Sequence, residues 1–548
     1  MSKRGGSPNA ENCVKRPESL TNSVANEYTK YHPSKKVDDV DVIELPSNPE
    51  SIVTFLRDYV IARKPCKING VISRELLLEG LTPTNITSTL PAQKVLQVER
   101  KVDGGFGSGE KKLRMTFEEL MARLKKGESG LYLTTQYAGE TDDGQDVDKS
   151  SAENFKNTEE EDDGEDEVKD DESSEEEDDE AGGPFDDDAL SDAESFTVGD
   201  CRDDFDDLES LDEAAEIVVD LKSGPLDVTE AQERLKELYQ PPMDNLINIL
   251  PETPEFMNAL IPQQINLWIG ASAAQELNAD DAFLSNYDPK APRLGLGRSV
   301  PGGGSSSGLH HDHADNIYAP VSGRKRFTLF SPKDAAKMYT VGVVRKVYDS
   351  GVIDYARCQK SPSWRTLRDD GAILAEVAHQ QLNNGENLST HEKQKWQKII
   401  DEDEASVNQE SNAKLDPPSF SKVIPTVVHL DKIQDQSLQK KIRLRALEEW
   451  PLFFEANRLV VDLEPGQMLY LPTGWFHEVT SFGDSDTTIP DAQIHVAVNY
   501  WFIPPNGSSP DDLYPNEDKY WHNDFERTKA ALENERQETE VTKDDANL

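Results

Sequence analysis

The chain has 548 residues, 35% of them hydrophobic, and a formal net charge of −47 at pH 7. Residues 140–213 hold 36 acidic and 4 basic side chains, so this segment has a net charge of −32 and the rest of the chain −15. A chain of this length is expected to form one large or two smaller cores. Direct DNA binding is not expected, because the sequence has no concentrated basic block.

The cysteines and apolar segments exclude further classes. The four cysteines are scattered without a CxxC pair, which argues against a disulfide framework and against zinc fingers. The N-terminus has no apolar leader, and no stretch has the apolar length of a membrane span. We therefore expect an intracellular protein of the cytoplasm or nucleus, with no membrane association. The cysteines are Cys13, Cys66, Cys201 and Cys358.

The N-terminal residues 1–36 are polar, which predicts a disordered tail, with folded structure from Val37 onward. Residues 37–138 are interpreted as the first part of the folded domain. Apolar spacing and a polar start predict a helix from Pro49 and another from Thr116. Strands are expected near Lys67 and from Leu131.

The acidic segment, residues 139–213, has too little apolar content to offset the entropy of ordering and is predicted to be a disordered insert. Ser173, Ser174 and Ser191 each precede an acidic residue by three positions, the pattern that an acid-directed kinase such as casein kinase 2 accepts. A solvating insert without regulation is an equally good interpretation.

Residues 240–505 are interpreted as the main globular part, interrupted by an insertion at 333–455, and residues 506–548 as a charged C-terminal helix and tail. A hairpin with its turn at Ser322–Gly323 is expected. Short strands separated by Gly and Pro turns predict a mainly β fold with added helices, a jelly roll rather than a doubly wound sheet.

A histidine cluster carries the chemistry. Three of the ten histidines lie within residues 310–313. On a strand, His310 and Asp312 share one face, while His311 and His313 share the other. Together with His477, the first pair makes a two-histidine, one-carboxylate set of the kind that holds Fe(II) with open positions. The alternatives are histidines that bind no metal, and a zinc or non-catalytic site on His311 and His313.

These residues carry a resemblance to a family. The stretch from His310 to Phe327, with Leu471–His477 and Val498–Trp501, resembles the JmjC (jumonji-C, cupin-like) 2-oxoglutarate oxygenases. The resemblance implies a double-stranded β-helix, Fe(II) on His310, Asp312 and His477, and 2-oxoglutarate and O2 as co-substrates. It implies that Lys325 pairs with the distal carboxylate of 2-oxoglutarate. The other co-substrate contacts that it implies are Ser307, Asn316, Tyr318, Asn499 and Tyr132.

Strand parity supports the role of Lys325, since it alternates with Arg324 and Arg326 and is the one of the three expected to point inward. The main alternative is a solvated hairpin lysine. For Asn499 the alternative is a core hydrogen bond.

The resemblance implies hydroxylation of a protein side chain, lysine or arginine, coupled to decarboxylation of 2-oxoglutarate to succinate. It is closest to the small JmjC lysyl hydroxylases that act on ribosome-associated GTPases, so such a GTPase or another basic protein is the expected partner. Histone lysine demethylation is the first alternative. The second is a non-catalytic protein whose acidic segment binds basic partners. The C-terminal helix also offers a surface for a homodimer.

Overall fold

The computed structural model describes residues 24–101, 105–106, 112–136, 228–272, 281–358, 360–362, 364–384, 388–407 and 417–546. The acidic segment 139–213 and its three serines lie outside the described residues. No helix in the described part of the chain is long and apolar enough to cross a membrane.

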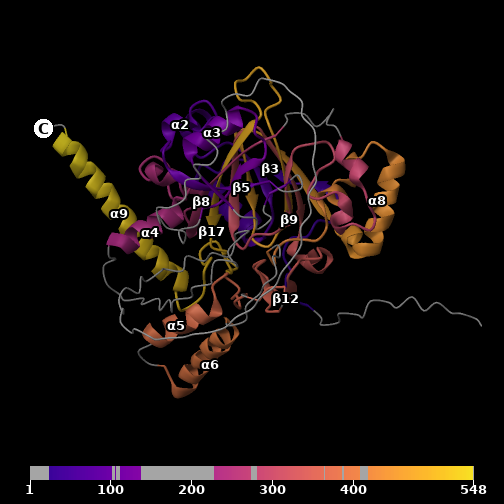
Figure 1. Ribbon diagram of the computed structural model, residues 1–548. Coiled ribbons are helices and arrows are strands. Elements are labelled where there is room, and N and C mark those ends of the chain that lie inside the picture. The colour runs from indigo at the N-terminus through magenta and orange to yellow at the C-terminus, as the bar shows by residue number, and fades with distance from the viewer. Residues whose placement is uncertain are drawn as a thin grey trace, which may run out of the picture.

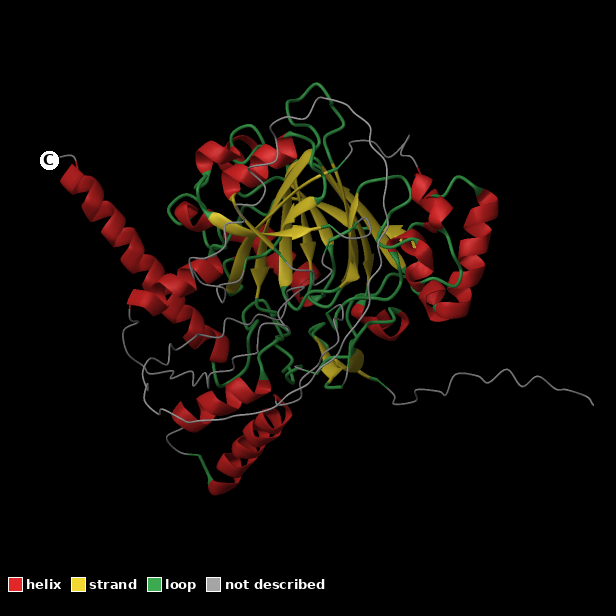
Figure 2. Ribbon diagram, in the orientation of Figure 1, coloured by secondary structure: helices red, strands yellow, loops and turns green. Residues whose placement is uncertain are grey.

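Two large β-sheets form the centre of the molecule, and helices surround them (Figure 2). The nine-stranded sheet has the order β3 (Asp41–Glu44), β4 (Cys66–Asn69), β15 (Gln467–Leu471), β10 (Asp315–Ser322), β17 (Ile494–Phe502), β8 (Pro262–Ala271), β7 (Leu131–Leu133), β5 (Val95–Arg100), β6 (Leu113–Thr116). The five-stranded sheet has the order β2 (Val37–Asp39), β14 (Arg458–Leu463), β11 (Arg324–Phe330), β16 (Phe476–Phe482), β9 (Ser305–His310). A small sheet contains β1 (Ala25–Asn26), β12 (Val343–Val347) and β13 (Ile353–Ala356).

The inner faces of the two large sheets pack against each other. One buried cluster combines Phe327 and Leu459 of the five-stranded sheet with Trp268, Leu469 and Ala497 of the nine-stranded sheet. Side chains at alternate positions along a strand share a face, so each inward residue has outward neighbours. This sheet-on-sheet core confirms the predicted mainly β jelly-roll fold.

The expected hairpin at Ser322–Gly323 is wrong. β10 pairs with β15 and β17, whereas β11 pairs with β14 and β16, so this turn carries the chain from one sheet to the other. Gly323 has φ +72, and a Cβ there would lie 2.3 Å from the carbonyl oxygen of Phe482. The local pattern of two strands and a turn is the same for a hairpin and for a crossing, and only sheet packing separates them.

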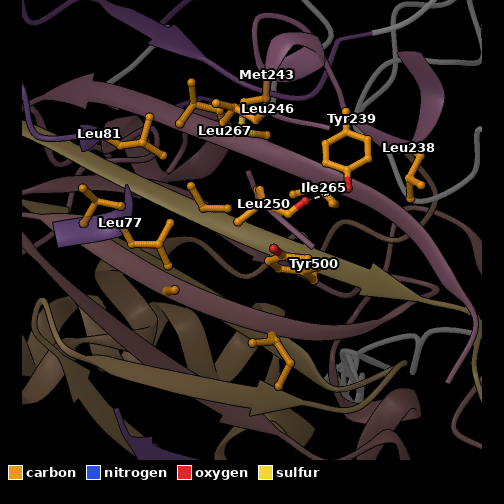
Figure 3. Close-up of a cluster of buried hydrophobic side chains, with 14 of the residues drawn as sticks. Leu77, Leu81, Leu238, Tyr239, Met243, Leu246, Leu250, Ile265, Leu267 and Tyr500 are labelled. Carbon is orange, nitrogen blue, oxygen red and sulfur yellow. Dashed lines mark hydrogen bonds between the residues drawn. The ribbon is translucent and has the colours of Figure 1, made fainter. Parts of the chain in front are cut away.

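Helices cover the outer face of the nine-stranded sheet. Their apolar residues pack with Ile265, Leu267 and Tyr500, and the Tyr239 hydroxyl donates to the carbonyl of Leu250 at 2.7 Å (Figure 3). Thr116 begins one of these helices by accepting from the Glu119 N–H, as expected. The helices are α1 (Pro49–Phe55), α2 (Ile86–Thr89), α3 (Phe117–Lys125) and α4 (Val228–Leu238).

The outer face of the five-stranded sheet is covered by the 333–455 insertion. Leu309, Phe330 and Phe476 pack there against residues of α7 (Pro425–Val428) and α8 (Gln436–Glu449). Figure 1 shows α8 on the opposite side of the sheets from α2 and α3. Two further helices of the insertion, α5 (Leu374–Asn384) and α6 (Thr390–Val407), pack together below the barrel (Figure 1).

Structured residues also lie outside the expected domain limits. Residues 24–36, expected in the N-terminal tail, include β1 and the buried Tyr28, whose hydroxyl donates to the carbonyls of Tyr31 and Arg63. The helix α4 lies before residue 240, the expected start of the main globular part. At the C-terminus, α9 (Tyr520–Ala546) packs on α4 and then extends away from the body (Figure 1).

Candidate metal and co-substrate site

Three potential metal ligands lie close together at the C-terminal end of β9. The ligand atoms of His310, Asp312 and His477 all lie within 4.8 Å of one another. The carboxylate of Asp312 approaches both imidazoles, with one oxygen 3.8 Å from Nε2 of His310 and the other 3.5 Å from Nε2 of His477. All three residues are buried. This donor set, two imidazoles and one carboxylate, is the one that non-haem Fe(II) sites use.

Hydrogen bonds set both histidines in the form that binds a metal. Nδ1 of His310 lies 3.0 Å from the carbonyl oxygen of Gly308, and Nδ1 of His477 lies 2.9 Å from that of Trp475. A carbonyl only accepts, so each Nδ1 carries the proton and each Nε2 presents its lone pair to the site. Burial lowers the pKa of His477 to about 4, and burial with the neighbouring His477 ring holds the pKa of His310 well below its ordinary value. Both rings are therefore neutral ligands near pH 7.

Asp312 lies two residues past the end of β9, not on a strand as expected. Its backbone is held instead by the loop that leads into β16. The carbonyl of Asp312 accepts from the Gly474 N–H at 2.9 Å and from the Thr473 hydroxyl at 3.2 Å. These bonds tie the second ligand to the loop that carries the third.

A buried ion pair anchors the same loop. The Arg63 guanidinium makes a bidentate contact with Asp315, with one bond at 2.8 Å, and both side chains are at most 2% exposed. Asp315 also accepts from the Tyr470 hydroxyl at 2.6 Å and from the Thr473 N–H at 3.0 Å. The pair thus joins the N-terminal segment, β10 and the loop before His477.

The rival pair faces away from the triad. The His311 and His313 rings lie 4.8 Å apart on the other side of the chain. His311 Nε2 is 2.5 Å from the Tyr355 hydroxyl, and His313 Nε2 is 2.9 Å from the carbonyl of Ile353. These contacts connect the pair to β13 of the insertion.

Lys325 points into the barrel, as strand parity predicted. It is 0% exposed, and its Nζ lies 2.7 Å from the Ser481 hydroxyl and 3.4 Å from the Tyr132 hydroxyl. Arg324 and Arg326 turn to the other side and pair with Asp462. No carboxylate of the described residues lies within ion-pair distance of Lys325. Burial, with repulsion from Lys101, holds the pKa of Lys325 well below its ordinary value.

The other residues predicted to contact the co-substrate, apart from Ser307, are Asn316, Asn499, Tyr132 and Tyr318. Asn499 accepts from Trp268 Nε1 at 2.8 Å and donates to Asn316 at 3.2 Å, so both asparagines belong to one chain of hydrogen bonds on the inner face. Tyr132 is beside Lys325, with its ring stacked 3.7 Å from Phe106. Tyr318 packs edge-on against Phe327.

Ser307 makes local contacts within the five-stranded sheet, and its predicted contact with the co-substrate stays a prediction. Its hydroxyl donates to the carbonyl of Gly308 at 2.8 Å and accepts from the Val479 N–H at 3.0 Å. The serine hydroxyl that contacts Lys325 is that of Ser481 on β16. The β9–β16 register is irregular between Glu478 and Thr480.

Several site residues were not predicted from the sequence. Phe420 of the insertion stacks on the His310 ring, with centroids 5.1 Å apart. Glu478, next to His477, accepts from His429 at 2.6 Å and from Ser306 at 2.5 Å. His495 lies 3.3 Å from Lys325 through its Nδ1. Of these, His495 alone had a signal in the sequence, because it lies four residues before Asn499 and alternate residues of a strand share a face.

The barrel and its His–Asp–His triad define a JmjC type of cupin-like protein. The cupin-like domain family matches residues 52–508, more than half of the chain, and the chain belongs to this family.

Individual relatives agree. The chain is 28% identical over 327 residues to JmjC domain-containing protein 4 of Schizosaccharomyces pombe, covering 50% of this chain and 61% of that protein. It is 28% identical to JmjC domain-containing protein E of Dictyostelium discoideum, covering 41% of this chain and 45% of that protein. It is 26% identical to Lysine-specific demethylase JMJ32 of Arabidopsis thaliana, covering 44% of this chain and 42% of that protein. The chain thus spans between 42% and 61% of the length of these curated relatives.

Proposed function

We propose that this chain is an Fe(II)- and 2-oxoglutarate-dependent oxygenase that hydroxylates a lysine or arginine side chain of a protein. The observation that carries the proposal is the convergence of His310, Asp312 and His477, with both Nε2 lone pairs directed at one point. Lys325, buried without an acidic partner among the described residues, supports an anionic co-substrate in the same barrel. The family match supports the same class.

In this proposal the three ligands hold Fe(II) and leave coordination positions free. Iron bound there, with 2-oxoglutarate and O2, supplies an oxidant that is able to attack an unactivated C–H bond. The chain itself supplies position and shielding. Asp312 is fixed through its backbone to Thr473 and Gly474, and Phe420 covers one face of the His310 ring. Lys325 and Tyr132 hold the distal carboxylate of the co-substrate.

Lysine demethylation is the second candidate, because one of the relatives has the name of a lysine-specific demethylase. It needs the same site and oxidant, but the target is an N-methyl group. The products separate the two: a hydroxylase adds one oxygen atom to the peptide, whereas a demethylase removes a methyl group.

The direct test is succinate release from 2-oxoglutarate by the full-length chain, loaded anaerobically with Fe(II) and then exposed to O2. The wild type is compared with His310→Ala and Asp312→Ala, and with His313→Gln as a matched control whose ring faces the insertion. We expect iron-dependent turnover in the wild type and the control, and none in the two ligand variants. Absence of iron binding by folded wild-type protein contradicts the proposal.

For the substrate, we propose a basic protein such as a ribosome-associated GTPase, in the cytoplasm or nucleus. Its support is the net charge of −47 and the resemblance set out above. Deletion of residues 140–213 separates catalysis from charge-based capture. The oxygenase proposal predicts that succinate release survives the deletion, whereas a protein that acts only as an acidic binding arm shows no turnover and loses its basic partners.

A further inference from the structure

A second lysine, Lys101, lies near Lys325 and lowers its pKa by repulsion. Lys101 follows β5, and its Nζ donates to the Ser305 hydroxyl at 2.6 Å and to the carbonyl of Ala271 at 2.8 Å. Its Nζ lies 5.8 Å from the centroid of the Tyr132 ring, and the Nζ of Lys325 lies 5.8 Å from the same centroid. Two ammonium groups therefore lie near one aromatic ring.

The His495 ring completes this cluster. A lysine Nζ is a donor only, so the His495 Nδ1 beside Lys325 is the acceptor and the ring proton is on Nε2. That Nε2–H is buried and has no hydrogen-bond partner within the described part of the chain. Gly270 lies between His495 and Tyr132 in the register of β7, β8 and β17, and the absence of a side chain there leaves room for both rings.

The cluster has two ammonium groups and one nearby carboxylate, that of Glu99. Neither Lys101 nor Lys325 has a carboxylate within ion-pair distance among the residues that the structure describes. Burial lowers the pKa of Lys101 to about 8, although the nearby Glu99 acts in the opposite direction. Ammonium groups withdrawn from water in this way are stabilised by an anion. Two ammonium groups near one ring, with the neutral His495 beside Lys325, favour a ligand that presents a carboxylate to them.

We propose that Lys101 and His495 complete, with Lys325, the binding site for the distal carboxylate of the co-substrate, and that Lys101 makes the pocket selective for 2-oxo dicarboxylates. The inference rests on the proposed function. Lys101 adds a second charge to the Lys325 contact, and His495 orients the Lys325 Nζ through its Nδ1. A 2-oxo acid without the distal carboxylate gains nothing from either residue.

The experiment measures binding rather than turnover. Full-length protein is loaded with Mn(II) and titrated by calorimetry with 2-oxoglutarate, and separately with 2-oxopentanoate, which has a methyl group in place of the distal carboxylate. Lys101→Met should weaken 2-oxoglutarate binding by about tenfold or more, the worth of a lost hydrogen bond to a charged group. Binding of 2-oxopentanoate should not change. His495→Phe, which keeps the ring but not its nitrogens, should act in the same direction.

Two further variants keep the result interpretable. Arg324→Met removes the charge of the residue that precedes Lys325 on β11, whose side chain pairs with Asp462 on the other face of the sheet. This variant should bind both acids as the wild type does. Lys101→Gln retains polar contacts without charge and replaces Lys101→Met if that variant does not fold. If the Lys101 variants bind 2-oxoglutarate within twofold of the wild type, or lose both acids equally, the inference is wrong while the oxygenase proposal stands. If the wild type binds neither acid, the oxygenase proposal itself fails.

Discussion

His310 and His477 are direct cross-strand partners in the antiparallel pair β9–β16, with ring centroids 4.2 Å apart. Each ring is oriented in the same way, by a hydrogen bond from Nδ1 to the carbonyl two residues earlier in its own chain. The two ligands are thus placed by sheet pairing and aimed by their own backbones. This symmetry predicts a metal site that needs little rearrangement to bind.

Removing a ligand should abolish metal binding without unfolding the barrel. We expect His310→Ala or His477→Ala to weaken Mn(II) or Co(II) binding by at least about 100-fold, since even loss of an outer partner costs tenfold or more. Titration calorimetry measures the affinity. His311→Gln tests the rival register, because that ring contacts Tyr355 instead. Equal loss of metal in His311→Gln would show that the triad is wrongly assigned.

Co-substrate affinity should fall in alkaline solution. The pKa of Lys101 is lowered to about 8 in the free protein, and a bound carboxylate favours the ammonium form and raises that pKa. Binding then takes up a proton above pH 8, so 2-oxoglutarate affinity should drop by up to about tenfold per pH unit from pH 8 to 9.

The other groups near Lys101 do not reverse this sign. Burial lowers the pKa of Lys325 and of His495, and raises that of Tyr132. Because the pKa of Lys325 is also lowered, the loss of 2-oxoglutarate affinity should begin at a lower pH, and affinity should still fall as the pH rises. Calorimetry at pH 7, 8 and 9 in buffers of different ionisation enthalpy measures the proton uptake. An affinity for 2-oxoglutarate that is independent of pH over this range contradicts the prediction, and 2-oxopentanoate serves as the control ligand.

A single methyl group at Gly270 should damage the co-substrate pocket but spare the metal site. A Cβ at this position would lie 2.6 Å from Cδ2 of Tyr132 and 2.8 Å from Cε1 of His495. Gly270→Ala should therefore displace both rings, weaken 2-oxoglutarate binding and destabilise the fold by about 1–3 kcal/mol. Gly130→Ala is the matched control, since a Cβ there meets no atom within 4 Å. Unchanged 2-oxoglutarate affinity in Gly270→Ala argues against this pocket.

Breaking the Arg63–Asp315 pair should cost stability. Removal of one partner leaves an uncompensated buried charge, so Arg63→Met should lower the free energy of unfolding by about 3–5 kcal/mol. The double variant with Asp315→Asn should lose less than the sum of the two single changes. Urea denaturation measures these values. Arg57→Met, which breaks an exposed pair with Asp58, should have little effect. Additive losses in the double variant would mean that the two residues do not act as a pair.

The sequence by itself determined the residue types of the site and the local elements that carry them. Period-two alternation separated Lys325 from its flanking arginines, because alternation is a property of neighbouring residues. Three other features could not be predicted in this way: the crossing between sheets at Ser322–Gly323, the contact of Ser481 with Lys325, and the stacking of Phe420 on His310. Each depends on which distant strand pairs with which, and in what register, and one strand's sequence does not contain that information. Only the tertiary structure brought Lys101 and His495, 394 residues apart in the chain, to the surroundings of Lys325 and Tyr132, because the free energy that holds them there comes from the packing of the whole barrel.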